Sequence, residues 1–307
     1  MTDQPTRRRI PTDAHVGQWR ARDGWPLRHF AWPAGGKRGS ILFQGGRGDI
    51  FEKYLESFAG WHADGWEVEA FDWRGQGGSG RLAGRCGHID RFSTFVDDLA
   101  AFWADWVART PAPHVMIGHS MGGHLILRAL AEGVIAPAAV VLVAPMLGLR
   151  APISTGFGEG YARLMRGLGN PARPAWKGNE RPYTLTARQS LLTHDRARYE
   201  DELWWHAHDP ALVTGPPSWN WLVQAFESTR SLNADPRLAA LQTPILTLVA
   251  EADQLVDPRA ALSVSARMPN ARIVRFGAES AHEILREADP VRNRALGEIE
   301  AFLQANT

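Results

Sequence analysis

Short apolar runs alternate with longer amphipathic stretches along most of the chain. Runs that are short and bounded by turn residues predict buried β-strands at 41–44, 67–72, 114–118, 138–144, 245–250 and 271–276. Large apolar side chains at helical spacing predict helices at 51–64, 95–107, 121–130 and about 291–304. Strands that alternate with helices in this way indicate an α/β fold, in which helices flank a mostly parallel central sheet.

The alternation stops between residues 147 and 235. This stretch has Gly- and Pro-rich loops and short helical pieces, and it contains five tryptophans: Trp176, Trp204, Trp205, Trp219 and Trp221. We therefore predict one α/β core, built from residues 1–146 and 236–307, with a lid of residues 147–235 inserted between two of its strands.

The composition excludes several classes of protein. The 307 residues carry 34 Lys and Arg against 33 Asp and Glu, a formal net charge of +1, so no overall basic surface suggests nucleic-acid binding. The single cysteine, Cys86, can form neither an internal disulfide nor a cysteine-built zinc site.

The hydropathy of the chain also bears on its location. No run of about 18 apolar residues occurs, which argues against a transmembrane helix. The first ten residues are partly basic but lack a following apolar segment, so a secretory signal is not expected. We expect a cytoplasmic protein, with the Arg7–Arg9 run solvated; peripheral contact with the inner face of a membrane stays open, and the oligomeric state is undetermined.

One glycine-flanked serine carries the strongest chemical signal. Ser120 stands in the sequence Gly-His-Ser-Met-Gly, between an apolar strand and a helix, and this setting is typical of a nucleophile elbow. The alternative is an ordinary βα turn in which the serine caps the helix. A serine hydroxyl needs a base, and the base needs an orienting acid.

In this architecture the acid and then the histidine follow the serine along the chain. Asp253 comes three residues after a predicted strand, and His282 follows the next strand, so we predict Ser120 as nucleophile, His282 as general base and Asp253 as orienting acid. Glu251 and Asp257 compete with Asp253, although Asp257 precedes a proline and is more typical of a helix cap.

Other histidines fit the base less well. His119 is next to the serine on a sharp turn, where a structural role is favoured. Three more precede the acid in the predicted lid: His194, His206 and His208.

Acyl transfer also requires hydrogen-bond donors for an oxyanion. The backbone N–H of Met121 follows the nucleophile and supplies one donor. The second is expected in the glycine-rich loop after the first predicted strand, where we favour the N–H of Arg47 and keep Gly46 as the adjacent alternative. Gly46 is also predicted to contact bound substrate.

Short motifs covering most of the core occur at 43–47, 52–54, 72–81, 87–92, 96–99, 118–123, 250–253 and 281–284. Together they resemble the bacterial lysophospholipase and monoglyceride-lipase branch of the serine α/β-hydrolases. After the first strand that family often has the sequence His-Gly-x, whereas this chain has Gln-Gly-Gly-Arg at 44–47. When the two are aligned at Tyr54, Gly46 and Arg47 correspond to the Gly-x pair.

The resemblance implies an α/β-hydrolase fold and hydrolysis of a monoacyl lipid-like ester, either a lysophospholipid or a monoacylglycerol. A serine mechanism needs no metal and no organic cofactor. A general carboxylesterase or lactonase acting on small soluble esters is the alternative enzyme, and a non-catalytic ligand-binding protein on the same fold is the alternative of another class.

The lid tryptophans suggest where an acyl chain would bind. Their large apolar rings could line a slot beside the catalytic crevice or could simply pack the lid onto the core. We predict that the slot is lined by Trp204, Trp205, Trp219 or Trp221.

Overall fold

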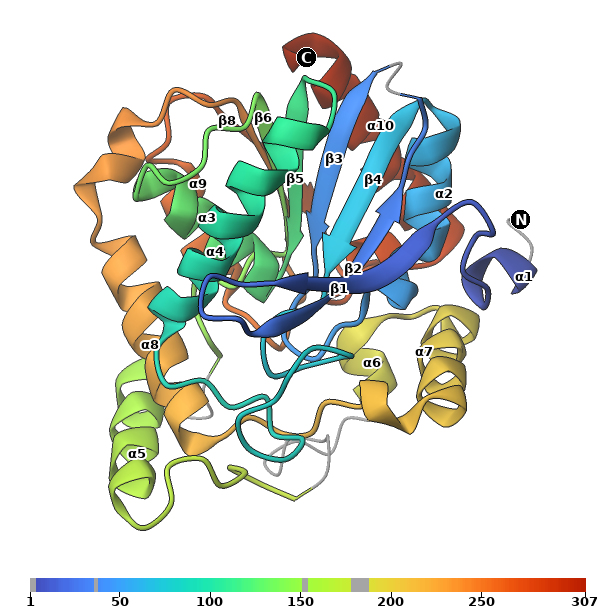
Figure 1. Ribbon diagram of the computed structural model, residues 1–307. Coiled ribbons are helices and arrows are strands. Elements are labelled where there is room, and N and C mark those ends of the chain that lie inside the picture. Colours follow the sequence, from blue (N-terminus) through green and yellow to red (C-terminus); the bar gives the residue numbers. More distant parts are fainter. Residues whose placement is uncertain (1–3, 36–37, 151–153, 178–187) are drawn as a thin grey trace.

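The computed structural model describes residues 4–35, 38–150, 154–177 and 188–307 (Figure 1). The described strands form one eight-stranded sheet in the order β1-β2-β4-β3-β5-β6-β7-β8. Their bounds are β1 (His15–Arg20), β2 (Pro26–Trp32), β3 (Gly39–Gln44), β4 (Trp66–Phe71), β5 (His114–His119), β6 (Ala139–Val143), β7 (Ile245–Ala250) and β8 (Ala271–Phe276). The pairs from β4 to β8 are parallel, which confirms the predicted α/β architecture.

Strands β1 and β2 carry no strand signal that was predicted from the sequence. They pair antiparallel with each other, and β2 also pairs antiparallel with β4. Every residue of β1 is at least partly exposed, and Val16 and Trp19 are its large apolar side chains. An edge strand of this kind buries too little surface to need an apolar run, so its sequence lacks the signal that marks the central strands.

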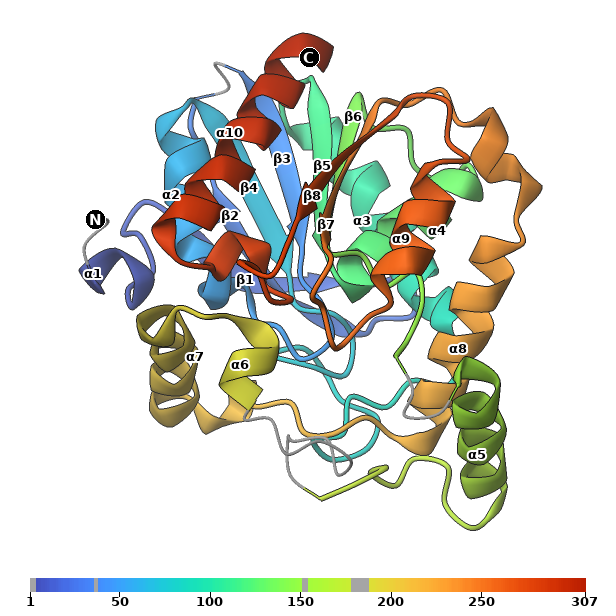
Figure 2. The same cartoon turned by 180° about the vertical axis from the view of Figure 1, so that it is seen from behind.

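Helices cover both faces of the sheet, as Figures 1 and 2 show. One buried cluster joins the sheet to α3 (Phe92–Arg109), α4 (Met121–Ala131) and α9 (Pro258–Ser265). A second cluster on the opposite face involves η1 (Phe51–Tyr54), α2 (Leu55–Ala63) and α10 (Asp289–Asn306). Burial on both faces explains why β5 and β6 are continuous apolar runs.

The predicted insertion is also observed, and we call the elements between β6 and β7 the cap. They are α5 (Thr155–Gly167), α6 (Arg188–Leu192), α7 (Arg196–His208), η2 (Pro210–Leu212), α8 (Trp219–Asn233) and η3 (Pro236–Ala240). Helices α5, α6 and α7 lie beyond the carboxyl ends of the parallel strands (Figure 1). Residues 151–153 and 178–187 of the predicted lid lie outside the described residues.

The N-terminal basic run differs from its prediction. Arg7 and Arg8, at the end of α1 (Gln4–Arg7) and just beyond it, form ion pairs with Asp201 of the cap at 2.5 and 2.6 Å. They are therefore tied to α7 rather than free in solvent. Among the helices in the described ranges, none has the length and apolar character needed to cross a bilayer.

Candidate active site

Ser120 lies at a strained turn between β5 and α4. Its φ of 51° and ψ of −115° fall in a region that L-residues rarely adopt. The turn needs glycine beside it, because a Cβ on Gly122 would lie 2.3 Å from the carbonyl oxygen of Gln44. The serine is only 7% exposed, and its accessible part faces a cavity at the carboxyl end of the sheet.

Asp253 and His282 follow adjacent strands and meet at the same end of the sheet. Strands β7 and β8 are in register, with Ala250 opposite Phe276, so the loops after them begin side by side. Asp253 Oδ2 lies 2.5 Å from His282 Nδ1. The other carboxylate oxygen accepts hydrogen bonds from the amides of Leu255 and Val256. These bonds fix the carboxylate and, through it, the orientation of the imidazole.

Both members of this pair are shifted toward their charged forms. Burial alone would lower the pKa of His282, but the nearby carboxylates, first of all Asp253, outweigh burial and raise it. Burial would likewise raise the pKa of Asp253, yet the charge and hydrogen bond of His282 lower it. An imidazolium is therefore stabilised at this position.

The competing acids have other partners. Asp257 caps α9 by accepting a hydrogen bond from the amide of Arg259 at 3.0 Å. Glu251 bonds to Arg275 on the exposed side of β8 at 2.6 Å. The structure thus brings Asp253 to His282 and places each competitor in a structural contact.

His119, which directly precedes Ser120, lies beside His282. Its ring centre is 4.7 Å from that of His282, and its Nε2 is 3.4 Å from the His282 carbonyl oxygen. Because Ser120 follows His119 directly, this contact holds the serine and His282 at one site, and both line the same cavity.

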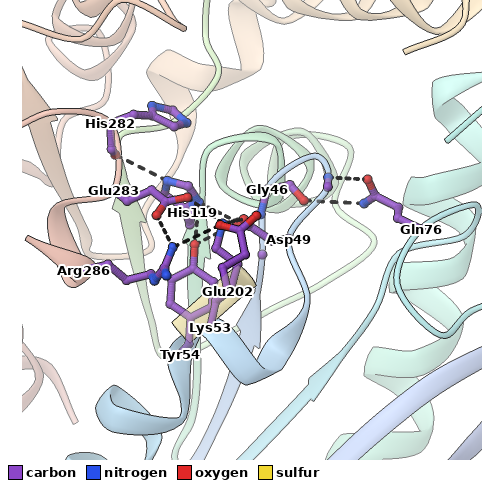
Figure 3. Close-up of polar contacts among 12 residues, drawn as sticks. Gly46, Asp49, Lys53, Tyr54, Gln76, His119, Glu202, His282, Glu283 and Arg286 are labelled. Carbon is purple, nitrogen blue, oxygen red and sulfur yellow. Dashed lines mark hydrogen bonds and ion pairs between the residues drawn. The ribbon is translucent and has the colours of Figure 1, made fainter. Parts of the chain in front are cut away.

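The loop after β3, residues 45–50, covers the serine and is called here the β3 loop. A Cβ on Gly46 would lie 2.9 Å from Ser120 Cβ, so glycine is required for this close approach. The Gly46 amide donates to Asp49 Oδ2 at 2.6 Å, so this amide is already engaged within the loop. Gln76 accepts from the Gly48 amide and holds the loop from the other side (Figure 3).

The cavity that contains Ser120 and His282 has a volume of about 580 Å³. One end is apolar and is formed mainly by α5, α8 and the loops beside them; its lining includes Met146, Leu149, Phe157, Tyr161, Met165, Trp176, Trp219, Trp221, Leu222 and Phe226. The other end, beside α6 and α7, carries the charged and polar side chains of Asp49, Lys53, Arg188, His206 and Glu283. Arg47, whose guanidinium lies over the Trp221 ring, and Arg150 also line the cavity. Such a cavity suits a ligand with one apolar and one polar end.

The four tryptophans predicted to line an acyl slot divide into two pairs. Trp219 and Trp221 line the apolar end of the cavity. Trp204 and Trp205 are not among the residues that line it, so the structure places these two away from the cavity. Trp205 Nε1 donates to the Arg7 carbonyl at 3.0 Å, and Trp204 stacks on His208. These two rings face α1 because α7 turns its other side toward the cavity.

Sequence reasoning missed a buried charged cluster beneath the site, drawn in Figure 3. It joins Lys53 of η1 to carboxylates from the β3 loop, the cap and the loop after β8: Asp49, Glu202 and Glu283. Arg188 and Arg286 add further positive charge beside Glu202 and Glu283. The four-residue spacing of Asp49 and Lys53 is a local signal in the sequence. No such local spacing marks the partners from the cap and from the loop after β8.

Comparison with known proteins identifies the family of the chain. The chain matches the family described as serine aminopeptidase, S33, over residues 35–289. It is 32% identical to lysophospholipase L2 of Escherichia coli K12 over 217 residues, which cover 66% of this chain and 61% of that relative. It is 28% identical to probable lysophospholipase L2 of Haemophilus influenzae over 62% of this chain and 60% of the relative. The chain thus spans less than two thirds of these relatives.

Solved structures share the fold over nearly the whole chain. A soluble variant of monoglyceride lipase from Saccharomyces cerevisiae, in complex with a substrate analogue, superimposes with a TM-score of 0.74 at 19% identity, covering 97% of this chain and 98% of the other. Monoacylglycerol lipase of Paleococcus ferrophilus gives a TM-score of 0.70 at 20% identity, covering 91% of this chain and 98% of the other. The predicted α/β-hydrolase fold is confirmed. Because the family match extends over most of its length, the chain belongs to the serine aminopeptidase S33 family of α/β-hydrolases.

Proposed function

We propose that this α/β-hydrolase cleaves carboxylic esters through an acyl-enzyme, with Ser120 as nucleophile, His282 as general base and Asp253 as orienting acid. The observation that carries the proposal is the hydrogen-bonded Asp253–His282 pair, which shares one cavity with a serine on a strained turn. A non-catalytic binding protein would not need this combination of strain and a buried charged pair.

The chemistry follows from the positions of these groups. His282 Nε2 takes the proton of Ser120 Oγ as that oxygen attacks the ester carbonyl carbon. The N–H groups of Met121 and Arg47 stabilise the resulting oxyanion. His282 then gives the proton to the departing alcohol, and Asp253 stabilises the transient imidazolium. A water molecule, deprotonated by His282, releases the carboxylic acid and restores the serine.

The substrate class we propose is a single-chain lipid ester, a lysophospholipid or a monoacylglycerol. The apolar end of the cavity would take the acyl chain along Trp219 and Trp221, and the polar end would take the headgroup. The names of the relatives, lysophospholipase L2 and monoglyceride lipase, favour the same class. Small soluble esters, the alternative substrates, would leave most of the apolar end unfilled.

A surface feature supports substrates drawn from a lipid aggregate. Helix α5 and its first following residue expose Phe157, Tyr161, Leu164 and Leu168 by 49 to 58% along one side. Residues 150–177 contain five basic residues and one acidic residue, whereas the whole chain has a net charge of only +1. An apolar stripe with positive charge is typical of a helix that lies on an anionic lipid surface. We propose this peripheral contact for α5, whose Phe157 and Tyr161 also line the cavity.

One experiment tests the proposed chemistry. A fluorophosphonate probe should label the parent protein and not Ser120→Ala, and this substitution should reduce kcat on p-nitrophenyl esters about 10³-fold or more. The probe should label a denatured parent no better than it labels Ser120→Ala. Labelling that survives the substitution would refute the assignment of Ser120.

A panel of substrates then separates the candidate classes. It compares a lysophospholipid, a monoacylglycerol, p-nitrophenyl esters of graded chain length and an aminoacyl anilide, the last because of the family's description. Rates that are highest for the shortest chains would favour the general carboxylesterase. Cleavage of the anilide alone would exclude the proposed ester substrates.

A further inference from the structure

Lys53 occupies an unusual position beneath the candidate active site. Its side chain is only 1% exposed, and its Nζ lies 2.6 Å from Asp49 Oδ1, 2.6 Å from Glu283 Oε1 and 3.2 Å from Glu202 Oε2. A lysine is almost never this deeply buried unless it is paired. Here one ammonium meets carboxylates from three separate parts of the chain (Figure 3).

The first contact reaches the β3 loop. Asp49 binds Lys53 through Oδ1, and its Oδ2 accepts hydrogen bonds from the Gly46 amide at 2.6 Å and the Tyr54 hydroxyl at 2.8 Å. The same oxygen lies 2.9 Å from His119 Nδ1. A change in the position of Asp49 would therefore move the backbone beside Ser120.

The second contact reaches the β8 loop, defined here as residues 277–287. Glu283, which follows His282 directly, binds Lys53 through Oε1 and Arg286 through Oε2. Cap residues support the same loop, since the amides of His282 and Glu283 donate to the carbonyls of Leu191 and Leu192 at 3.4 and 2.7 Å. The third contact, with Glu202 of α7, joins this arrangement to the cap.

We propose that Lys53 is a positioning residue: its ammonium holds the β3 loop and the β8 loop in fixed relation to each other and attaches both to cap helix α7. This inference rests on the proposed function, in which the β3 loop supplies an oxyanion donor and the β8 loop supplies the base. Lys53 acts through Asp49 and Glu283 and takes no part in proton transfer.

The same ammonium offsets the negative charge around His282. Four charged or titratable groups face this histidine: Asp253 from the loop after β7, Glu283 from its own loop, Asp49 from the β3 loop and His119 from β5. Lys53 bonds to two of the three carboxylates. Without its charge, Asp49 and Glu283 would favour the imidazolium more strongly, and the pKa of His282 would rise.

The test measures kcat/KM against pH for a water-soluble acetate ester. The fall in kcat/KM on the acidic side of this profile, called here the acid limb, reports the ionisation of the free enzyme's base. Lys53→Met should lower kcat about 10²-fold with little change in KM, because the reacting groups are displaced. Its acid limb should move upward by about one pH unit. Glu283→Gln removes a negative charge beside His282, so its acid limb should move to lower pH. In the double variant Lys53→Met/Glu283→Gln the acid limb should return toward the pH of the parent.

The control is Arg74→Met, which removes another buried cation with a carboxylate partner, Asp98 at 2.7 Å. It should lower the melting temperature but keep the acid limb of the parent. If Lys53→Met also keeps the parent limb, Lys53 contributes to stability alone and the proposal is wrong. If Lys53→Met fails to fold, Glu283→Gln decides instead: an acid limb at the pH of the parent would then show that the proposal is wrong. A parent that does not react with fluorophosphonate would instead overturn the proposed function.

Discussion

At the scale of single residues, the site depends on the register of two adjacent strands. Asp253 and His282 are 29 positions apart, yet their side chains meet because β7 and β8 run parallel and end together. Asp253 also receives two backbone amides, so its carboxylate is fixed before any substrate binds. A carboxylate fixed in this way holds the imidazole of His282 in one orientation.

The two neighbouring aspartates should therefore differ sharply when each is replaced by asparagine. Asp253→Asn should reduce kcat roughly 10⁴-fold, because the amide cannot orient the imidazole or stabilise its charge. Asp257→Asn should change kcat little, since Asp257 only accepts a backbone hydrogen bond at the start of α9. Steady-state kinetics on a p-nitrophenyl ester decides between them, and the opposite ranking would move the acid to Asp257.

At the scale of elements, α7 and α8 use their faces differently. Helix α7 directs Glu202 toward the buried cluster and His206 toward the cavity, while Trp204 and Trp205 contact the N-terminal segment. Residues four positions apart share one face of a helix, so Glu202 and His206 point the same way, whereas Trp204, two positions after Glu202, lies on the opposite side.

The division between the tryptophans predicts a dependence on chain length. Trp219→Ala should raise KM for long-chain esters about tenfold or more, because an acyl chain loses an apolar wall, and should leave acetate esters nearly unaffected. Trp204→Ala is the matched control from the same cap and should not change the chain-length profile. Equal losses on both kinds of ester in Trp219→Ala would mean that Trp219 only packs α8 against α5.

Helix α5 predicts binding to lipid vesicles. Its inner face packs through Ala162 and Met165 against Trp219 and Val223, and Leu164 and Leu168 beside that face are exposed. In cosedimentation with vesicles of phosphatidylcholine and phosphatidylglycerol, Leu164→Ser/Leu168→Ser should weaken binding at least about tenfold.

The control for the vesicle experiment is Leu203→Ser, which removes a leucine of similar exposure, 46%, from another helix. It should bind like the parent, and vesicles of phosphatidylcholine alone should bind all variants more weakly. Leu164 and Leu168 are not among the residues that line the cavity, so the rate of acetate ester hydrolysis should be unchanged in the double variant. Parent protein that stays in the supernatant, or that forms dimers through α5, would contradict a lipid contact.

At the scale of the whole molecule, buried ion pairs connect the cap to the core. Arg198 of α7 is 5% exposed and bonds to Glu56 of α2 and Asp289 of α10. Lys53 and Glu202 add a second connection near the site. Removing one partner of a buried pair typically costs about 3–5 kcal/mol, so this half of the cap is held firmly.

These pairs predict loss of stability in acid. Neighbouring cations outweigh burial and lower the pKa of Asp49, Glu202 and Glu283. A depressed carboxyl pKa adds stability above the unfolded value of about 4, and that stability is lost as the pH falls through the folded value. Burial raises the pKa of four other carboxyls, Glu52, Glu67, Asp72 and Asp98, which act in the opposite direction. They are fewer than the carboxyls whose pKa is lowered, which also include Asp23, Glu69, Asp253 and Asp289.

The melting temperature should therefore be lower at about pH 4 than at about pH 7. Glu202→Gln should reduce this difference by destabilising the protein mainly at neutral pH, whereas Glu200→Gln, on an exposed part of the same helix, should not. Thermal unfolding followed by circular dichroism measures both. A melting temperature that rises on acidification would show that the carboxyls with lowered pKa values do not control the pH dependence of stability.

The sequence by itself determined the parallel core, the position of the cap and the Asp253–His282 pair. Buried parallel strands need continuous apolar runs, so β5, β6 and β7 are readable directly from hydropathy. Residues that directly follow such strands must gather at one edge of the sheet, which is why the loops carrying Ser120, Asp253 and His282 could be identified from their order.

Only the tertiary structure decided which tryptophans reach the cavity and which charges lie beneath the site. The amphipathic pattern of α7 does not say which neighbour covers which face, and Trp204 and Trp205 pack toward α1. Lys53 meets Glu202 and Glu283 across about 150 and 230 positions, a contact with no local pattern in the sequence. Hydropathy and turn chemistry act over a few residues, whereas a buried charge is satisfied by whichever partner the complete fold brings to it.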